Sequence, residues 1–164
     1  MHPNEELIHR FYAAFQKRDA ATMASCYHPD VRFSDPVYTD LRGWRAGAMW
    51  RFLCERAASS GLRIEYRDVS ADDRAGRAHW DAYYRFGTGR DVHNSIDAEF
   101  EFKDGKIVRH RDRFDFWRWT RMALGPVGVL LGWTPLIQNG VRKKAGGLFE
   151  AWIAKNGVAP TAAR

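Results

Sequence analysis

The chain has 164 residues, 45% of them hydrophobic and 14% aromatic, which is enough for one domain with a real core and too few for two. Its formal net charge is +6, but charges of both signs are interleaved, as at Arg63 and Glu65, and this pattern argues against nucleic-acid binding. Cys26 and Cys54 are too few for a disulfide framework, so we expect a cytoplasmic protein.

Two segments could be mistaken for membrane-targeting sequences. Residues 1–15 carry acidic residues and a helical pattern, whereas a signal peptide needs a basic start and an apolar run. Residues 122–141 are uncharged but contain Pro126, Pro135 and four glycines, whereas a spanning helix needs about 20 mostly apolar residues. We expect neither a signal peptide nor a membrane span.

Two helices are predicted near the N-terminus. In the first, which ends near Lys17, Asn4 can serve as the N-cap, and apolar residues recur every three or four positions: Leu7, Ile8, Phe11, Tyr12 and Phe15. Asp19 can cap a short second helix over 20–27, which the following His-Pro-Asp stops because proline restricts the residue before it. Residues 31–37 are predicted to be a short extended segment.

A third helix and four strands follow. The helix covers 43–61, where apolar residues form two adjoining stripes and Gly61 offers a left-handed stop. After Gly61 the apolar period changes from about 3.6 residues to 2, which is typical of strands. Turns are expected at 71–76, 87–91 and 103–106, and the last of these contains Asp104-Gly105, the strongest hairpin signal in the chain.

Alternation along the first three of these strands defines one apolar face. Its members are Leu62, Ile64, Tyr66, Ala78, Trp80, Ala82, Tyr84, Phe86, Ile96, Ala98, Phe100 and Phe102. The helices must bury their apolar stripes against this face. The sequence therefore predicts an α+β domain over 1–117, a cone-shaped half-barrel in which a curved, mainly antiparallel sheet wraps around three N-terminal helices.

The last strand, predicted over 108–116, differs from its neighbours. Its inward positions include His110 and Asp112 among apolar residues. A carboxylate in an apolar cavity costs several kcal/mol unless it is paired, so Asp112 is expected to hold a partner or to have a raised pKa. His110 and Asp112 could share a hydrogen bond; a purely structural pair, or a bulge that turns both to solvent, is the alternative.

Asp35 is a second candidate carboxylate. It lies in a loop fixed by Pro36, where it could point into the mouth of the cone or form an Asx turn. With Asp112 and His110 it would make a polar, catalytic end to an aromatic pocket. The substrate-binding residues predicted for that pocket are Tyr12, Phe15, Trp44, Trp80, Tyr84, Phe100 and Phe114.

Residues 118–157 are predicted to be a helical C-terminal extension. It contains two tryptophans before Pro135, and its last part repeats apolar residues at helical spacing: Val141, Ala145, Leu148 and Trp152. This extension could cover the cone, pack against a second subunit, form a lid over a ligand pocket or contact a membrane surface. Residues 158–164 are expected to be frayed.

The order of these elements, with HRFYAAFQKRDAATMASCYHPDVRFSDP over 9–36 and DGKIVRHRDRFDF over 104–116, resembles the nuclear transport factor 2-like superfamily. The SnoaL-like branch is the nearest match, and the resemblance covers about residues 5–117. It implies the cone fold, a small hydrophobic ligand and a homodimer. The superfamily includes isomerases, cyclases, epoxide hydrolases, dehydratases and binding proteins, so the resemblance alone fixes little chemistry.

Ketosteroid isomerases have a general-base aspartate in a similar segment, and the resemblance places it at Asp35 in this sequence. Their oxyanion-hole tyrosine falls at Phe11, with Tyr12 rotated by about 100° on the helix. Their partner aspartate would be Asp97, which is expected to point outward while Ala98 takes the inward position. The resemblance to the steroid isomerases thus keeps a base and loses its electrophile.

SnoaL-like cyclases use a cavity aspartate, often with a histidine nearby, and these roles would fall to Asp112 and His110. Epoxide hydrolases need an Asp-Arg-Asp arrangement, whereas the arginines at 109, 111 and 113 are expected to point away from the inner face. The histidines show no metal-ligand spacing. We predict an isomerase or cyclase without cofactor or metal; a non-catalytic ligand-binding or dimerisation domain is the alternative, and an epoxide hydrolase ranks third.

Overall fold

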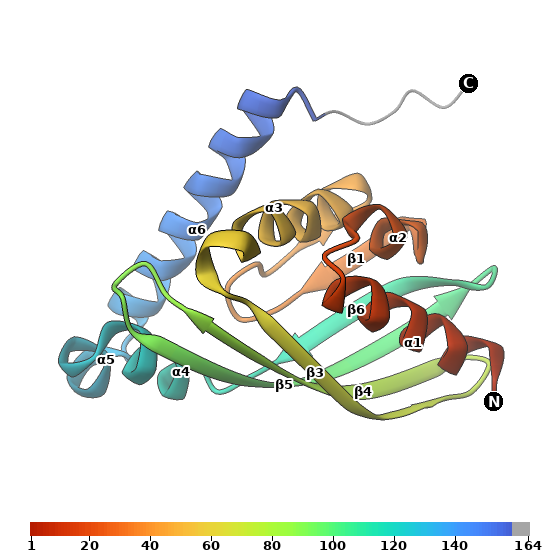
Figure 1. The fold of residues 1–164 in the computed structure, drawn as a ribbon, viewed down its shortest axis with the longest axis horizontal. Helices are drawn as coiled ribbons and strands as arrows, with labels where there is room; N and C mark the ends of the chain where they lie inside the picture. The colour runs from red at the N-terminus through yellow and green to blue at the C-terminus, as the bar shows by residue number, and fades with distance from the viewer. Residues whose placement is uncertain (159–164) are drawn as a thin grey trace.

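The computed structural model describes residues 1–158, which form six helices and six strands (Figure 1). In chain order these are α1 (Pro3–Gln16), α2 (Ala20–Ser25), β1 (Tyr27–Ser34), β2 (Leu41–Arg42), α3 (Trp44–Ser60), β3 (Arg63–Ala71), β4 (Ala75–Arg85), β5 (Asp91–Lys103), β6 (Lys106–Arg113), α4 (Phe116–Leu124), α5 (Pro126–Leu131) and α6 (Pro135–Asn156).

The strands form one curved sheet in the order β2-β1-β6-β5-β4-β3. All neighbouring pairs are antiparallel except β1 and β6, which are parallel. Helices α1, α2 and α3 lie on one side of this sheet (Figure 1). The predicted α+β cone with a mainly antiparallel sheet is therefore confirmed.

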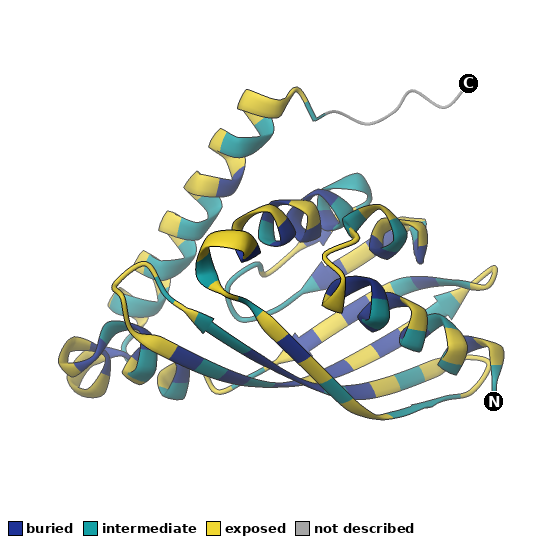
Figure 2. Ribbon diagram, in the orientation of Figure 1, coloured by how far each residue is buried: buried dark blue, intermediate teal, exposed yellow. Residues whose placement is uncertain are grey.

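The core lies between the three helices and the sheet. Strand positions alternate between buried and exposed, as the predicted period of two requires (Figure 2). The largest fully buried side chains come from every layer: Trp50, Tyr12, Phe11, Phe33, Phe100, Phe149, Ile8, Met23, Met49, Ile107, His110 and Val31. Aromatic rings thus fill most of the interior of the cone.

Two helix caps were predicted, and one of them was wrong. The N-cap of α1 is His2, whose Nδ1 accepts a hydrogen bond from the backbone N–H of Asn4 at 3.1 Å. Asn4 is instead buried, and its Nδ2 donates to the backbone oxygen of Asp72 at 2.8 Å. Asp19 caps α2 as expected, with Oδ1 accepting from the N–H of Thr22 at 3.0 Å.

The predicted ends of β1 and β6 were also wrong. Strand β1 starts at Tyr27 and not at residue 31, because its pairing with β6 shifts register between Tyr27 and Arg32 and this irregularity tolerates a proline. Strand β6 ends at Arg113, since Asp115 caps α4 by accepting from the N–H of Arg118 at 2.9 Å. Phe116 consequently packs in a second apolar cluster with helix α4.

The C-terminal half of the last helix, α6, packs on helix α3. Phe149 is buried against Phe52 of α3, with ring centroids 5.8 Å apart. Trp152 donates from Nε1 to the Glu55 carboxylate at 2.7 Å. The terminus predicted to be frayed, 158–164, lies outside the described residues apart from Val158.

Helix α5 is held against α4 by close backbone approach. A Cβ atom added at Gly128 would lie 1.9 Å from the carbonyl oxygen of Thr120, so a side chain there cannot be accommodated without separating the helices. None of the helices within residues 1–158 combines the length and the apolarity needed to cross a bilayer.

We predict that Gly128→Ala separates α5 from α4 and lowers stability by about 1–3 kcal/mol, the usual cost of overpacking. Urea unfolding and limited proteolysis between residues 125 and 134 measure the effect. Gly140→Ala is the matched control, because its added Cβ meets nothing within 4 Å, and it should gain up to ~1 kcal/mol from helix propensity. Equal stability and equal protease resistance of the two variants would contradict the close packing.

Candidate functional site

Strand β6 turns His110 and Asp112 inward, as predicted. His110 is 0% exposed and Asp112 is 3% exposed. In the register of the sheet, His110 pairs with Phe100 on β5 and Phe33 on β1, while Asp112 pairs with Ala98. An imidazole and a carboxylate therefore lie in the apolar core, where each needs hydrogen-bond partners.

A continuous chain of hydrogen bonds supplies those partners. Trp50 Nε1 on α3 donates to Tyr27 Oη at 2.6 Å, and Tyr27 Oη contacts His110 Nδ1 at 2.8 Å. His110 Nε2 lies 3.0 Å from Asp112 Oδ1, which also accepts from Trp80 Nε1 at 3.4 Å. Elements α3, β1, β6 and β4 thus meet at one buried polar chain.

This series of hydrogen bonds determines which nitrogen of His110 carries the proton. Tyr27 Oη already accepts the Trp50 N–H, so its own proton is free to be donated to His110 Nδ1. His110 Nδ1 is then an acceptor, and Nε2 carries the proton that it donates to Asp112. A neutral imidazole gives both nitrogens of His110 and the Tyr27 hydroxyl proton a hydrogen-bond partner, whereas a second proton on His110 would leave the Tyr27 hydroxyl proton without a partner.

Aromatic rings enclose His110 on the remaining sides. The ring centroids of Phe100, Phe33, Phe11 and Trp50 lie 4.5, 5.1, 5.4 and 5.9 Å from that of His110. Because no part of His110 is exposed, a bound molecule cannot touch it in this conformation. His110 can act on chemistry only through Asp112.

Asp35 lies just beyond the end of β1. Its Oδ1 accepts hydrogen bonds from the backbone N–H groups of Val37 at 2.7 Å and Tyr38 at 2.5 Å, so the predicted Asx turn is present. Oδ2 makes no hydrogen bond within residues 1–158. One oxygen therefore fixes the side chain, and the other has no hydrogen-bond partner among the described residues.

Burial raises the pKa of the Asp35 carboxyl from 3.8 to about 7. The hydrogen bonds from Tyr38 and Val37 act in the opposite direction, while the charge of Asp112 adds to the increase. A carboxyl with this pKa is populated in both protonation states at neutral pH, which is the property that a general acid or base needs.

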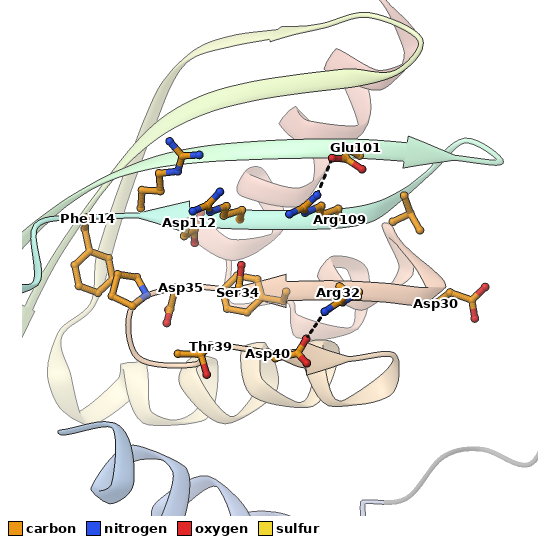
Figure 3. Close-up of a pocket in the computed structure, with 15 residues that line it drawn as sticks. Asp30, Arg32, Ser34, Asp35, Thr39, Asp40, Glu101, Arg109, Asp112 and Phe114 are labelled. Atoms are coloured by element: carbon orange, nitrogen blue, oxygen red, sulfur yellow. Dashed lines mark hydrogen bonds and ion pairs between the residues drawn. The ribbon is translucent and has the colours of Figure 1, made fainter. Parts of the chain in front are cut away.

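Asp35 and Asp112 line the same groove, which has a volume of about 830 Å³ (Figure 3). Phe114, Asp35 and Asp112 lie at one end of it, whereas the ion pairs Arg32–Asp40 and Arg109–Glu101 lie further along (Figure 3). The complete lining is Asp30, Arg32, Phe33, Ser34, Asp35, Pro36, Thr39, Asp40, Glu101, Val108, Arg109, Arg111, Asp112, Arg113 and Phe114. The groove thus has an apolar end and a polar, mostly charged wall.

Asp112 uses a single oxygen for its hydrogen bonds. Both hydrogen bonds of the side chain end on Oδ1. In the described part of the chain, Tyr12 Oη is the one fully buried side-chain polar atom without a hydrogen-bond partner. Asp112 Oδ2 makes no hydrogen bond with the described residues, and the Asp112 side chain, which is 2% exposed, is one of those that line the groove.

Phe114 is the one residue of the seven predicted to bind substrate that lines the groove. Tyr12, Phe15, Trp80 and Phe100 are buried in the core of the cone, where they contact each other and Trp50. Trp44 and Tyr84 are half-buried and lie outside the groove lining. The aromatic interior is therefore packed, and the open volume lies at its edge.

Sequence reasoning missed Tyr27 and Trp50, which complete the buried polar chain. Tyr27 had been placed at the end of the second helix, although it is the first residue of β1. Trp50 falls beside the two apolar stripes considered for α3, yet it is 1% exposed. Their polar atoms on otherwise buried positions were the available signal, because a buried Trp or Tyr needs a hydrogen-bond partner.

The residues that the resemblance to ketosteroid isomerases singled out lie on α1 and β5. Phe11 and Tyr12 are both fully buried, and Tyr12 stacks on Tyr66 with ring centroids 5.2 Å apart. Asp97 is exposed and bonds His79, whereas Ala98 is buried, as predicted. Within residues 1–158, no group of three or more His, Cys, Asp or Glu side chains has an arrangement that could hold a metal ion.

Comparison with known families agrees with this architecture. The model of the SnoaL-like domain matches residues 8–110. The chain belongs to the SnoaL-like domain family, which confirms the resemblance inferred from its elements. No curated protein matches the sequence.

Solved structures with the same fold carry several different descriptions. TerC, co-crystallised with polyporic acid, is 22% identical with a TM-score of 0.63, and the match covers 75% of this chain and 99% of TerC. A candidate polyketide cyclase from Xanthomonas campestris pv. campestris is 21% identical with a TM-score of 0.58, over 72% and 94% of the two chains. An LEH-like epoxide hydrolase of M. tuberculosis is 22% identical with a TM-score of 0.58, over 78% and 94%. At these identities the similarity establishes the fold.

We predict that Tyr12→Phe increases stability by about 1 kcal/mol, because it removes a buried hydroxyl that has no partner among the described residues. Tyr27→Phe is the matched control: it removes a hydroxyl that bonds two partners, and it should cost about 1–3 kcal/mol. Urea unfolding at pH 7 measures both. A loss of stability in Tyr12→Phe would show that its hydroxyl has a partner.

Proposed function

We propose that this SnoaL-like protein is an isomerase or cyclase that needs no cofactor and moves a proton on a carbonyl compound. The supporting observation is that Asp35 and Asp112 line one groove. Asp35 combines a fixed Oδ1, an unbonded Oδ2 and a pKa of about 7. Asp35 is the general base and acid of this proposal.

The reaction begins when ionised Asp35 Oδ2 removes a proton from the carbon next to the carbonyl, and the electron pair moves to the carbonyl oxygen. In an isomerase, protonated Asp35 returns the proton to another carbon of the enolate. In a cyclase, the enolate carbon attacks a second carbonyl, a carbon–carbon bond forms, and Asp35 returns its proton to the new alkoxide. In both cases the carboxylate is regenerated.

Asp112 and His110 assist this proton transfer without exchanging the proton themselves. The charge of Asp112 helps to raise the pKa of Asp35, and Asp112 Oδ2, which has no hydrogen-bond partner among the described residues, is the atom proposed to accept a hydrogen bond from the substrate. His110 is a positioning residue, because it is enclosed and holds Asp112 through Nε2. The hydroxyls of Ser34 and Thr39 are available donors along the groove.

The lining of the groove suggests the form of the substrate. Pro36 and Phe114 offer apolar contacts beside Asp35, while the wall further along is rich in arginine. Arg111 makes no ion pair with the described residues and is exposed. A suitable substrate has a hydrophobic carbonyl end at Asp35 and a polar or anionic end along the wall.

A non-catalytic binding protein is the second candidate. The observation that favours it is the closed chain from Trp50 to Trp80, which gives His110 and one oxygen of Asp112 a full structural account. An epoxide hydrolase ranks lower, because its arginine would have to lie between the two carboxylates. Neither Asp35 nor Asp112 forms an ion pair with an arginine in residues 1–158. Homodimerisation stays a prediction.

The proposal is tested by deuterium exchange in D₂O with cyclic 1,3-diketones and β,γ-unsaturated ketones as probes, followed by NMR. The intact protein should exchange the hydrogen next to the carbonyl, and Asp35→Asn should slow this exchange by roughly 10²–10⁴-fold, the usual contribution of a general base. Since the base must be ionised, the rate should rise with pH up to about 7 and then level off.

Asp40→Asn is the matched control, because Asp40 lines the same groove but is engaged by Arg32 and Arg42. It should leave the exchange rate nearly unchanged. If Asp35→Asn and Asp40→Asn behave alike, Asp35 is not the base. Probe binding without any exchange would favour the non-catalytic candidate.

A further inference from the structure

The surface formed by α4, α5 and the start of α6 is unusually apolar. Nine large hydrophobic side chains are exposed in the described residues, and seven of them fall within residues 117–136: Trp117, Val127, Val129, Leu130, Leu131, Trp133 and Leu136. We call these seven residues the apolar tip. Leu136 is 80% exposed, Leu130 70% and Trp133 61%. Such clustering marks a site of interaction, whereas single exposed hydrophobic residues are ordinary.

The tip is a built structure that projects from one end of the molecule. Figure 1 shows α4 and α5 beyond the end of the sheet, and Figure 2 shows that α5 is mainly exposed. Trp117 Nε1 lies 3.2 Å from the carbonyl oxygen of Gly128 and 3.3 Å from that of Val129, and it donates to both. Together with the close approach of Gly128 to α4, these contacts fix α5 with its leucines facing outward.

Basic side chains predominate around the tip. Residues 116–149 contain five basic residues and no Asp or Glu: Arg118, Arg121, Arg142, Lys143 and Lys144. Arg121 lies over the ring of Trp117, with its guanidinium carbon 4.7 Å from the ring centroid. The edge of the apolar surface is therefore positively charged.

Three arginines also gather in a surface hollow beside the tip. Arg90, Arg118 and Arg121 line it, with Met122, Gly89 and Asp91. Arg90 is fixed because its Nε donates to the carbonyl oxygen of Met122 at 2.8 Å. The single acid, Asp91, is already paired with Arg85 at 3.1 Å. Guanidinium groups in this arrangement suit phosphate oxygens.

We propose that the apolar tip docks into the interface of an anionic lipid bilayer, with Arg90, Arg118 and Arg121 contacting lipid phosphates. Leu130, Leu131 and Leu136 enter the boundary between headgroups and acyl chains, and Trp133 lies at the level of the headgroups, where tryptophan is enriched. Apolar burial and charge attraction together give such a contact its strength.

The charge distribution favours a lipid surface over a second copy of the chain. A symmetric dimer through this surface would place the same patch against itself. That arrangement would bring two mainly basic edges together, and like charges in contact are unfavourable. An anionic bilayer instead neutralises these charges.

The test is co-sedimentation of the full chain with vesicles of phosphatidylcholine containing 30% phosphatidylglycerol, compared with pure phosphatidylcholine. We expect binding to the anionic vesicles that weakens with added salt. Leu130→Ser with Leu131→Ser should reduce it roughly tenfold or more through lost apolar burial. Arg118→Gln with Arg121→Gln should reduce it about 25-fold, since each basic residue near an anionic leaflet contributes about fivefold.

Two control variants lie outside the tip. Leu148→Ser changes another exposed leucine, and Arg74→Gln changes an exposed arginine in the turn between β3 and β4, near the opposite end of the sheet (Figure 1). Both should bind vesicles as the unchanged protein does. The proposal is overturned if anionic and neutral vesicles bind equally, if the controls lose as much binding as the tip variants, or if the leucines instead hold a dimer that does not bind vesicles.

Discussion

The structure depends on one constraint: the carboxylate of Asp112, which is buried in an apolar core, must be given hydrogen-bond donors. An uncompensated carboxylate there would cost several kcal/mol. The compensation comes from His110 and Trp80 directly, and from Tyr27 and Trp50 through His110. Four elements must therefore be in place at once, so a polar chain specifies how β6, β1, β4 and α3 meet.

The buried hydrogen bonds leave one oxygen of Asp112, Oδ2, without a partner among the described residues, and Asp112 is also one of the residues that line the groove. Asp35 lines the same groove and is fixed there by an Asx turn. Burial and the charge of the nearby Asp112 raise the pKa of Asp35. We interpret Asp35 as the reactive member and Asp112 as its electrostatic support.

The sequence predicted the features that follow from local periodicity. Alternation placed His110 and Asp112 inside and Asp97 outside, and the proline after Asp35 indicated the turn. The hydrogen bond between His110 and Asp112 was predicted and is confirmed. The second partner, Tyr27, was not predicted, because it reaches His110 through the parallel pairing of β1 with β6, which is not marked by any hairpin turn in the sequence. That same pairing sets Arg32 beside Arg109 on the outer face, which is why the groove wall is charged where an aromatic pocket had been expected.

The C-terminal extension shows a similar division. Helical spacing predicted an amphipathic helix and the helix is present, but Phe149 is the residue buried in the core, whereas Leu148 of the predicted stripe is 44% exposed. The exposed leucines of α5 follow from a close contact between Gly128 and Thr120 that no periodicity reveals. An apolar tail had been one ground for expecting a homodimer; the proposed membrane contact removes that ground and leaves the family resemblance.

The central claim is that Asp35 carries a proton at near-neutral pH while it lies beside Asp112. The most direct measurement is a titration of the Asp35 carboxyl carbon by NMR in ¹³C-labelled protein, with Asp35→Asn used to assign its signal. The account predicts a midpoint close to pH 7. A midpoint near pH 4, the ordinary value for an exposed aspartate, would contradict it.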